Sequence, residues 1–89
     1  MERIFVFCYF MKFDPKALRT RIPAQIAYWE KHAPENFSGG PFNDRSGGMI
    51  TFSAPDQEAA ESICRDDPFV TEGLVDAYWV REWLVSHRR

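Results

Sequence analysis

The sequence predicts an α+β fold in which two helices cover one face of an antiparallel sheet. The first observation is length, because 89 residues make one domain, 1–89. The second is the order of elements, β-α-β-β-α-β, read from runs of alternating and helical periodicity. In a domain of this size that order most often folds as a ferredoxin-like layer. The third is that the first and last strands are apolar on both faces, which requires cover on both sides.

The first strand and helix are read from residues 3–32. Residues 3–11 (RIFVFCYFM) are β-branched and aromatic, which is typical of a strand. Asp14 and Pro15 suit the cap and first position of a short helical piece. Because proline inside a helix costs about 3 kcal/mol, we expect the main helix to start at residue 20 or 21 and to run to about residue 32, with Pro23 in its first turn. Its apolar side is then Ile22, Ile26, Trp29 and Ala33.

The second half of the chain predicts two strands, a helix and a last strand. A short edge strand, a glycine-rich turn and a strand occupy residues 36–42, 43–48 and 48–53. Ser53, followed by Ala-Pro-Asp56, resembles a capping box that opens a helix over 54–66. Pro68 then ends that helix.

The last strand, residues 76–85, carries large apolar side chains on both faces. Tyr78, Val80 and Leu84 lie on one face, and Trp79, Trp83 and Val85 on the other. Two helices cover only one face of a sheet, so the aromatic side chains of the other face would form an unusually large exposed patch. Two such sheets packed face to face would bury both patches. We therefore predict a homodimer through the open sheet face, in a barrel-like arrangement.

Composition and charge exclude several classes of function. A net charge of −2 offers no basic surface for nucleic acid, and the one basic cluster, residues 87–89, is read as a solvated tail. No stretch approaches the roughly 18 apolar residues that span a membrane, and the N-terminus does not resemble a signal peptide, so a cytoplasmic protein is expected. Cys8 and Cys64 lack CxxC spacing and are interpreted as small core residues. No spacing of Cys, His or carboxylates suggests a metal or other cofactor.

Asp67 is the one carboxylate on the apolar stripe of the second predicted helix. Ala60, Ile63 and Cys64 share a face at helical spacing, and residue 67 continues it. Burial and the negative end of the helix dipole would both raise the pKa of this carboxyl group, and such a group suits general acid–base catalysis. The alternative is an Asx turn, in which Asp67 accepts hydrogen bonds from backbone amides after Pro68.

Residues 66–75 (DDPFVTEGLV), before an aromatic-rich strand, resemble the YCII-related family of the dimeric α+β barrel superfamily. The stretches GGPFND and GMITFSAPDQEAAESI match the same pattern, and the resemblance runs from the first strand to Trp83. It implies the ferredoxin-like dimer and a histidine–aspartate pair that serves acid–base chemistry on small molecules. Asp67 matches the aspartate, whereas Gln25 stands where the histidine usually lies. Glutamine can hydrogen-bond to Asp67, but it cannot take up or release a proton.

Two functions stay open at this stage. One is a cofactor-free lyase or isomerase with Asp67 as the catalytic acid or base, because the resemblance implies chemistry on hydroxylated aromatics or lactones. Its substrate-binding candidates are Gln25, Trp29, His32, Phe69 and Tyr78, whose aromatic members suit a small planar substrate. The alternative is a non-catalytic ligand-binding or accessory protein that keeps the pocket after loss of the histidine. An oxygenase on the same fold lacks a clear haem ligand and ranks last.

Overall fold

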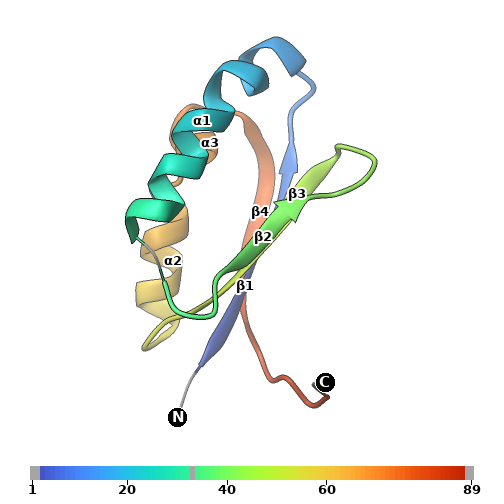
Figure 1. Cartoon of the computed structure of the whole chain (residues 1–89). Helices are drawn as coiled ribbons and strands as arrows, with labels where there is room; N and C mark the ends of the chain where they lie inside the picture. The colour runs from blue at the N-terminus through green and yellow to red at the C-terminus, as the bar shows by residue number, and fades with distance from the viewer. Residues whose placement is uncertain (1–2, 33, 88–89) are drawn as a thin grey trace.

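The computed structural model describes residues 3–32 and 34–87. Its four strands form one antiparallel sheet in the order β2-β3-β1-β4. They are β1 (Ile4–Met11), β2 (Ser38–Pro41), β3 (Gly47–Ser53) and β4 (Val75–Trp83). Three helices, α1 (Pro15–His32), α2 (Gln57–Arg65) and α3 (Pro68–Thr71), lie on one face of this sheet (Figure 1). The predicted ferredoxin-like α+β fold is confirmed.

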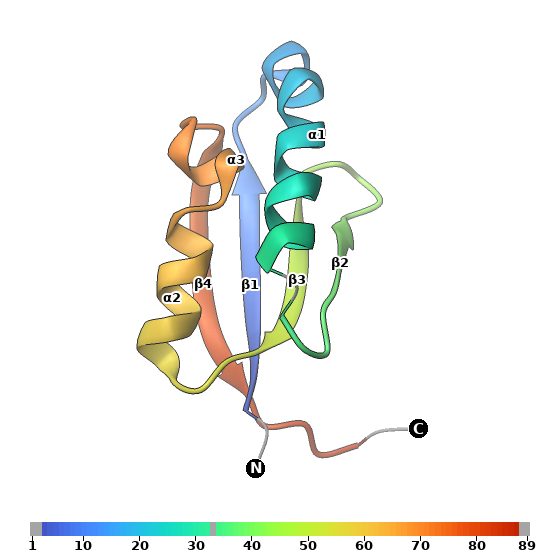
Figure 2. The ribbon, with the colours of Figure 1, turned by 60° about the vertical axis from the view of Figure 1, so that its left-hand side comes forward.

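Strand β1 lies in the centre of the sheet and supplies much of the core. Phe5, Phe7 and Tyr9 point to the helix-covered face and are buried. Phe5 pairs with Phe52 on β3, and Phe7 pairs with Val80 on β4, so the buried side chains of three strands form one layer. Figure 2 shows α1 and α2 side by side over this layer.

Helix α1 is longer than the sequence predicts, because it starts at Pro15 and contains Pro23 in its interior. The Asp14 carboxylate caps it by accepting a hydrogen bond from the Ala17 amide at 3.1 Å, as expected. The separate helical piece and the later start at residue 20 or 21 are therefore wrong. Pro23 is exposed, so its ring meets solvent and not the sheet, and Figure 1 shows the helix bending between its first turns and the rest. Ala33 lies outside the described residues.

Helix α2 also begins later than predicted. Its cap is Asp56, which accepts from the Ala59 amide at 2.8 Å, while Ser53 is the last residue of β3 and accepts a hydrogen bond from Asn36. Helix α2 ends at Arg65, before Pro68, as predicted, but a further short helix that the sequence did not predict, α3, follows it. Pro68 starts α3, because proline suits a first helical position, where no amide donor is needed.

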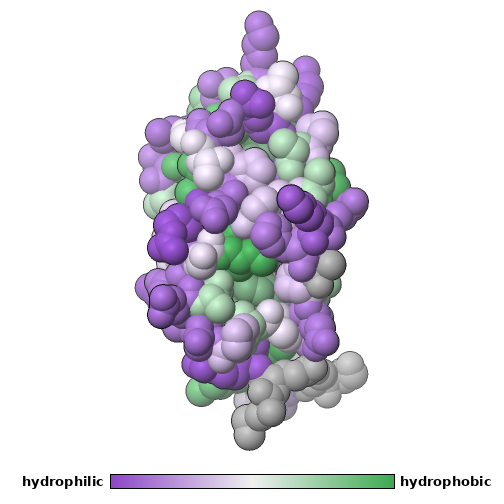
Figure 3. Space-filling model, turned by 90° about the vertical axis from the view of Figure 1, so that its left-hand side faces the viewer, coloured by the Kyte–Doolittle hydropathy of each residue, from purple (hydrophilic) through white to green (hydrophobic). Residues whose placement is uncertain are grey.

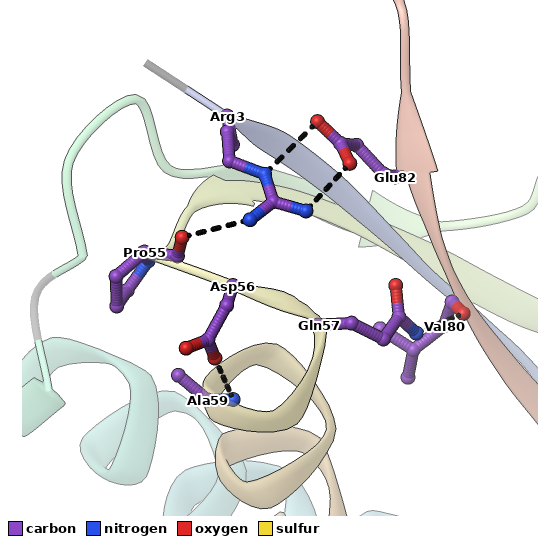
Figure 4. Close-up of polar contacts among 7 residues, drawn as sticks. All are labelled: Arg3, Pro55, Asp56, Gln57, Ala59, Val80 and Glu82. Atoms are coloured by element: carbon purple, nitrogen blue, oxygen red, sulfur yellow. Dashed lines mark hydrogen bonds and ion pairs between the residues drawn. The ribbon is translucent and has the colours of Figure 1, made fainter. Parts of the chain in front are cut away.

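A polar cluster ties α2 to the sheet at the end opposite to α3 (Figure 4). The Arg3 guanidinium donates to both carboxylate oxygens of Glu82, at 3.2 and 2.9 Å, and to the Pro55 carbonyl at 3.0 Å. Gln57 donates to the Val80 carbonyl at 3.0 Å. These bonds join β1, β4 and the start of α2 at one corner of the molecule.

The three helices of the described residues all lie on the first face of the sheet, and the second face carries apolar side chains. Trp79 and Trp83 lie there next to Cys8 and Ile4 of β1, and remain 38% and 49% exposed. Leu84 and Val85 lie beyond the end of β4, so their predicted places on the strand are wrong, and Leu84 is 81% exposed. Cys8 and Cys64 are buried and free, as predicted. Arg88 and Arg89 of the basic tail lie outside the described residues.

None of the helices in the described ranges combines the length and the apolar character that crossing a lipid bilayer requires.

Candidate functional site

A cavity of about 800 Å³ lies between α1 and the part of the sheet formed by β1, β3 and β2. Its volume is in the range of pockets that bind small molecules. Aliphatic side chains contribute much of the lining: Met11, Leu18, Ile22, Ile26 and Ile50. The outer surface of the helix layer is mostly hydrophilic, with a small apolar area near its centre (Figure 3).

Four aromatic side chains also line the cavity. Trp29 and Phe37 stack with ring centroids 5.8 Å apart and an interplanar angle of 20°. Tyr9 and Phe69 meet edge to face with centroids 6.1 Å apart. Aromatic rings so arranged offer flat faces and edges to a planar ligand.

Asp67 is fully buried and accepts hydrogen bonds at both carboxylate oxygens. Its Oδ1 accepts from the Phe69 amide at 2.7 Å, which is the Asx turn that caps α3. Its Oδ2 accepts from Trp29 Nε1 at 2.6 Å and from Gln25 Nε2 at 3.3 Å. The turn and the contact with Gln25 are therefore both present, each on its own oxygen.

The pKa of the Asp67 carboxyl is raised above its ordinary value because the group is buried away from water. Hydrogen bonds from Trp29, from the Phe69 amide and from Gln25 favour the ionised form and offset part of this rise. The expected contribution of a helix C-terminus is wrong. Helix α2 ends at Arg65 with Asp66 as its cap, and Asp67 lies at the N-terminus of α3, where backbone amides stabilise its charge.

Gln25 connects Asp67 to the cavity. Gln25 and Trp29, the two side-chain donors to Asp67, both line the cavity, while Asp67 lies behind them. Gln25 also interacts with the Tyr9 hydroxyl and lowers its pKa, although burial has the larger effect and raises it. A ligand in the cavity would therefore meet the amide of Gln25, and Asp67 would hold that amide in place.

Tyr9 is a cavity residue that sequence reasoning missed, because it reads there as one of many apolar residues on β1. Its ring lies over Gly48 on β3, where an added Cβ would come 2.4 Å from the Tyr9 hydroxyl and 2.8 Å from the Gly40 carbonyl. Glycine at position 48 thus makes room for the tyrosine. The one available signal was a tyrosine in a strand otherwise rich in phenylalanine.

Two predicted binding residues lie outside the cavity. The His32 ring packs on Tyr28 with centroids 4.2 Å apart, at the exposed end of α1. Tyr78 meets Phe7 edge-on with centroids 5.5 Å apart and does not line the cavity. The structure thus brings Gln25, Trp29, Phe69 and Asp67 together and leaves His32 and Tyr78 apart. Within residues 3–32 and 34–87, no group of three or more His, Cys, Asp or Glu side chains is placed to hold a metal ion.

The order of the elements, the cavity under α1 and the buried Asp67 agree with the resemblance noted in the sequence. The sequence model of the YCII-related domain matches residues 5–84. The chain belongs to the YCII-related family. No curated protein sequence matches it.

The fold of this YCII-related chain is similar to that of a protein whose structure has been solved. It is 5-chloro-2-hydroxyhydroquinone dehydrochlorinase (TftG) from Burkholderia phenoliruptrix, in complex with 2,5-dihydroxybenzoquinone, and the TM-score is 0.76. The sequences are 24% identical, over 90% of this chain and 92% of that one. At this level of identity the similarity establishes a shared fold.

Proposed function

We propose that this chain binds a small, planar ring compound in the cavity between α1 and the sheet. One observation carries the proposal: the side-chain amide of Gln25 lines an aromatic and aliphatic cavity of about 800 Å³ and is hydrogen-bonded to the fully buried carboxylate of Asp67. Apolar walls with a few placed polar groups are the usual composition of a small-molecule site.

The cavity lining indicates how such a ligand would be held. Trp29 and Phe37 would pack on the ring, and Tyr9 and Gln25 would hydrogen-bond to an oxygen substituent. Asp67 accepts one N–H of Gln25, which orients the amide before a ligand arrives. The structure of TftG contains 2,5-dihydroxybenzoquinone, a planar ring with oxygen substituents, which supports this ligand class.

The test measures how ligands shift the unfolding temperature. Wild type and Gln25→Leu are heated with hydroxylated benzoquinones, chlorinated hydroquinones and small lactones. A ligand at a hundred times its dissociation constant stabilises the protein by about 2.7 kcal/mol. We expect this shift in wild type and a smaller one in Gln25→Leu, which keeps the volume of the side chain but loses the amide.

The matched control is Gln57→Leu, because Gln57 donates to the Val80 carbonyl at the start of α2 and does not line the cavity. We expect this variant to keep the full ligand shift. If none of the compounds raises the unfolding temperature of wild type, the cavity does not bind this class. Equal ligand shifts in the two variants would place the ligand elsewhere.

The second candidate function is a cofactor-free lyase or isomerase, in which Asp67 acts as a general acid or base. The raised pKa of Asp67, directly behind the cavity, favours it. Gln25 cannot transfer a proton, so proton exchange between Asp67 and a ligand would require the Gln25 side chain to move aside. The geometry therefore supports binding more directly than catalysis.

Turnover of a ligand found in the thermal experiment separates the two functions. If the protein is an enzyme, Asp67→Asn abolishes turnover while the ligand still binds. Gln25→His places a titratable group next to Asp67, and we expect it to raise turnover. Binding without turnover in wild type and in Gln25→His would leave the ligand-binding function alone.

We also propose that two copies of the chain associate through the helix-free face of the sheet. The proposal rests on the apolar side chains exposed there: Phe10, Met49, Trp79 and Trp83. Such an arrangement leaves the cavity on the outer, helix-covered side of each copy, where a ligand can enter.

A further inference from the structure

The positively and negatively charged side chains that line the cavity lie toward opposite ends of it. Arg19 and Arg45 line the cavity together with one acidic residue, Glu30. Arg19 lies in the second turn of α1, and Glu30 lies about three turns further along the same helix. The cavity thus has a cationic end near the start of α1 and an acidic residue toward the other end.

The second arginine of the cationic end comes from the loop between β2 and β3. That loop is held beside the end of β1 by a hydrogen bond from the Met11 amide to the Ser46 carbonyl, at 2.8 Å. Because β1 leads directly into α1, this end of the sheet lies next to the first turns of the helix. Arg45 adopts a left-handed backbone conformation, with φ of 65°, in the tight turn closed by the bond from its amide to the Phe42 carbonyl.

Neither cavity arginine forms a salt bridge within the described part of the chain. Asp44, next to Arg45, instead accepts hydrogen bonds from the Ser46 amide and hydroxyl at 2.9 and 2.7 Å. Arg21 differs from Arg19, because it pairs with Glu72 at 2.7 Å and does not line the cavity. Of the two arginines in this turn of α1, one is already paired and the other faces the cavity.

We propose that the ligand of this cavity carries a carboxylate, which Arg19 and Arg45 bind at the cationic end. This inference rests on the proposed binding of a planar ring. A guanidinium group offers a planar fork of donors that matches a carboxylate. Glu30 repels a carboxylate at the other end, so the charges also orient the ring within the cavity.

The test compares two probes of the same shape, 2-naphthoate and 2-naphthamide, of which only the first is charged at neutral pH. Dissociation constants are measured by titration calorimetry for wild type, Arg19→Gln, Arg45→Gln and the control Arg21→Gln. In wild type we expect 2-naphthoate to bind about fivefold more tightly than 2-naphthamide, the upper range for a partly exposed ion pair. Each cavity variant should lose about half or more of that preference, and Arg21→Gln should keep it.

The outcomes separate this inference from the function on which it rests. Equal affinity of wild type for the two probes overturns the carboxylate and leaves ring binding intact. If neither probe binds, ring binding itself fails, and the carboxylate with it. An equal loss of preference in Arg21→Gln and Arg19→Gln overturns direct contact, because it indicates that the net positive charge of the region, and not Arg19 itself, attracts the carboxylate. If 0.5 M salt weakens the binding of 2-naphthoate but not that of 2-naphthamide, the result supports a charge interaction.

Discussion

At the scale of single residues, the two carboxylate oxygens of Asp67 have different hydrogen-bond partners and different roles. Oδ1 caps α3, and Oδ2 accepts from Trp29 and Gln25, which line the cavity. Ionisation is opposed by burial and supported by these donors, and burial has the larger effect on its pKa. A residue in this position couples the stability of the fold to the geometry of the cavity.

We predict that Asp67→Asn destabilises the protein by about 1–3 kcal/mol, the cost of a buried donor without an acceptor. The asparagine amide can accept from the Phe69 amide, but its other end then turns N–H groups toward the Trp29 indole. Denaturant titrations of the two proteins at neutral pH measure this difference in the free energy of unfolding.

The same pair of proteins tests the pKa of Asp67. Because its folded-state pKa is raised above 3.8, wild type gains stability relative to Asp67→Asn on acidification. This gain in the free energy of unfolding is fully present below pH 3.8 and is lost as the pH rises through the folded-state pKa. Above that pKa the difference in stability between the two proteins no longer changes with pH. An advantage that instead grew as the pH rose through this window would mean that the hydrogen bonds outweigh burial.

At the scale of elements, α1 and α3 each contain a proline, at positions with different effects on the helix. Pro68 occupies the first position of α3, where a missing amide costs nothing. Pro23 occupies the interior of α1, where it removes one hydrogen bond and bends the helix. The sequence predicted that one helix begins shortly before Pro23 and that another ends before Pro68. The second prediction is confirmed, because α2 ends at Arg65, whereas α1 continues through Pro23.

We predict that Pro23→Ala stabilises the protein by about 1–3 kcal/mol, because alanine restores an amide donor and relieves the ring from the preceding turn. Pro15→Ala is the control, since Pro15 is the first residue of the same helix. Its replacement should change the free energy of unfolding by less than about 0.5 kcal/mol. A loss of stability in Pro23→Ala would indicate that the bend itself is needed for packing of α1 on the sheet.

At the scale of the whole molecule, one face of the sheet is covered by helices and the other is open. The apolar side chains of the open face come from alternate positions of β1, β3 and β4, the same strands whose other positions build the core. An exposed surface of this kind usually marks an interface.

We predict that Trp79→Asp prevents self-association, because it places a charge among the apolar side chains of the open face. Sedimentation velocity should give a dimer for wild type and a monomer for this variant. Phe13→Asp is the matched control, since Phe13 is 98% exposed and lies in the connection between β1 and α1, outside the strands. A monomeric wild type would contradict the proposed homodimer.

The sequence by itself determined the order of the four strands and of α1 and α2, but not α3, together with the two-faced strands and the burial of Asp67. These features depend on periodicity over a few residues, which is local information. It also placed Gln25 opposite Asp67 through the family resemblance, and the structure joins the two at 3.3 Å.

Only the tertiary structure decided which side chains share the cavity. Tyr9 reaches it because Gly48 on the neighbouring strand leaves room for its ring. Arg19 faces the cavity, whereas Arg21 pairs with Glu72, the C-terminal cap of α3. His32 and Tyr78 lie outside the cavity, because His32 packs on Tyr28 and Tyr78 packs on Phe7. The Tyr9–Gly48 and Arg21–Glu72 contacts join residues distant in sequence, and no local pattern encodes them.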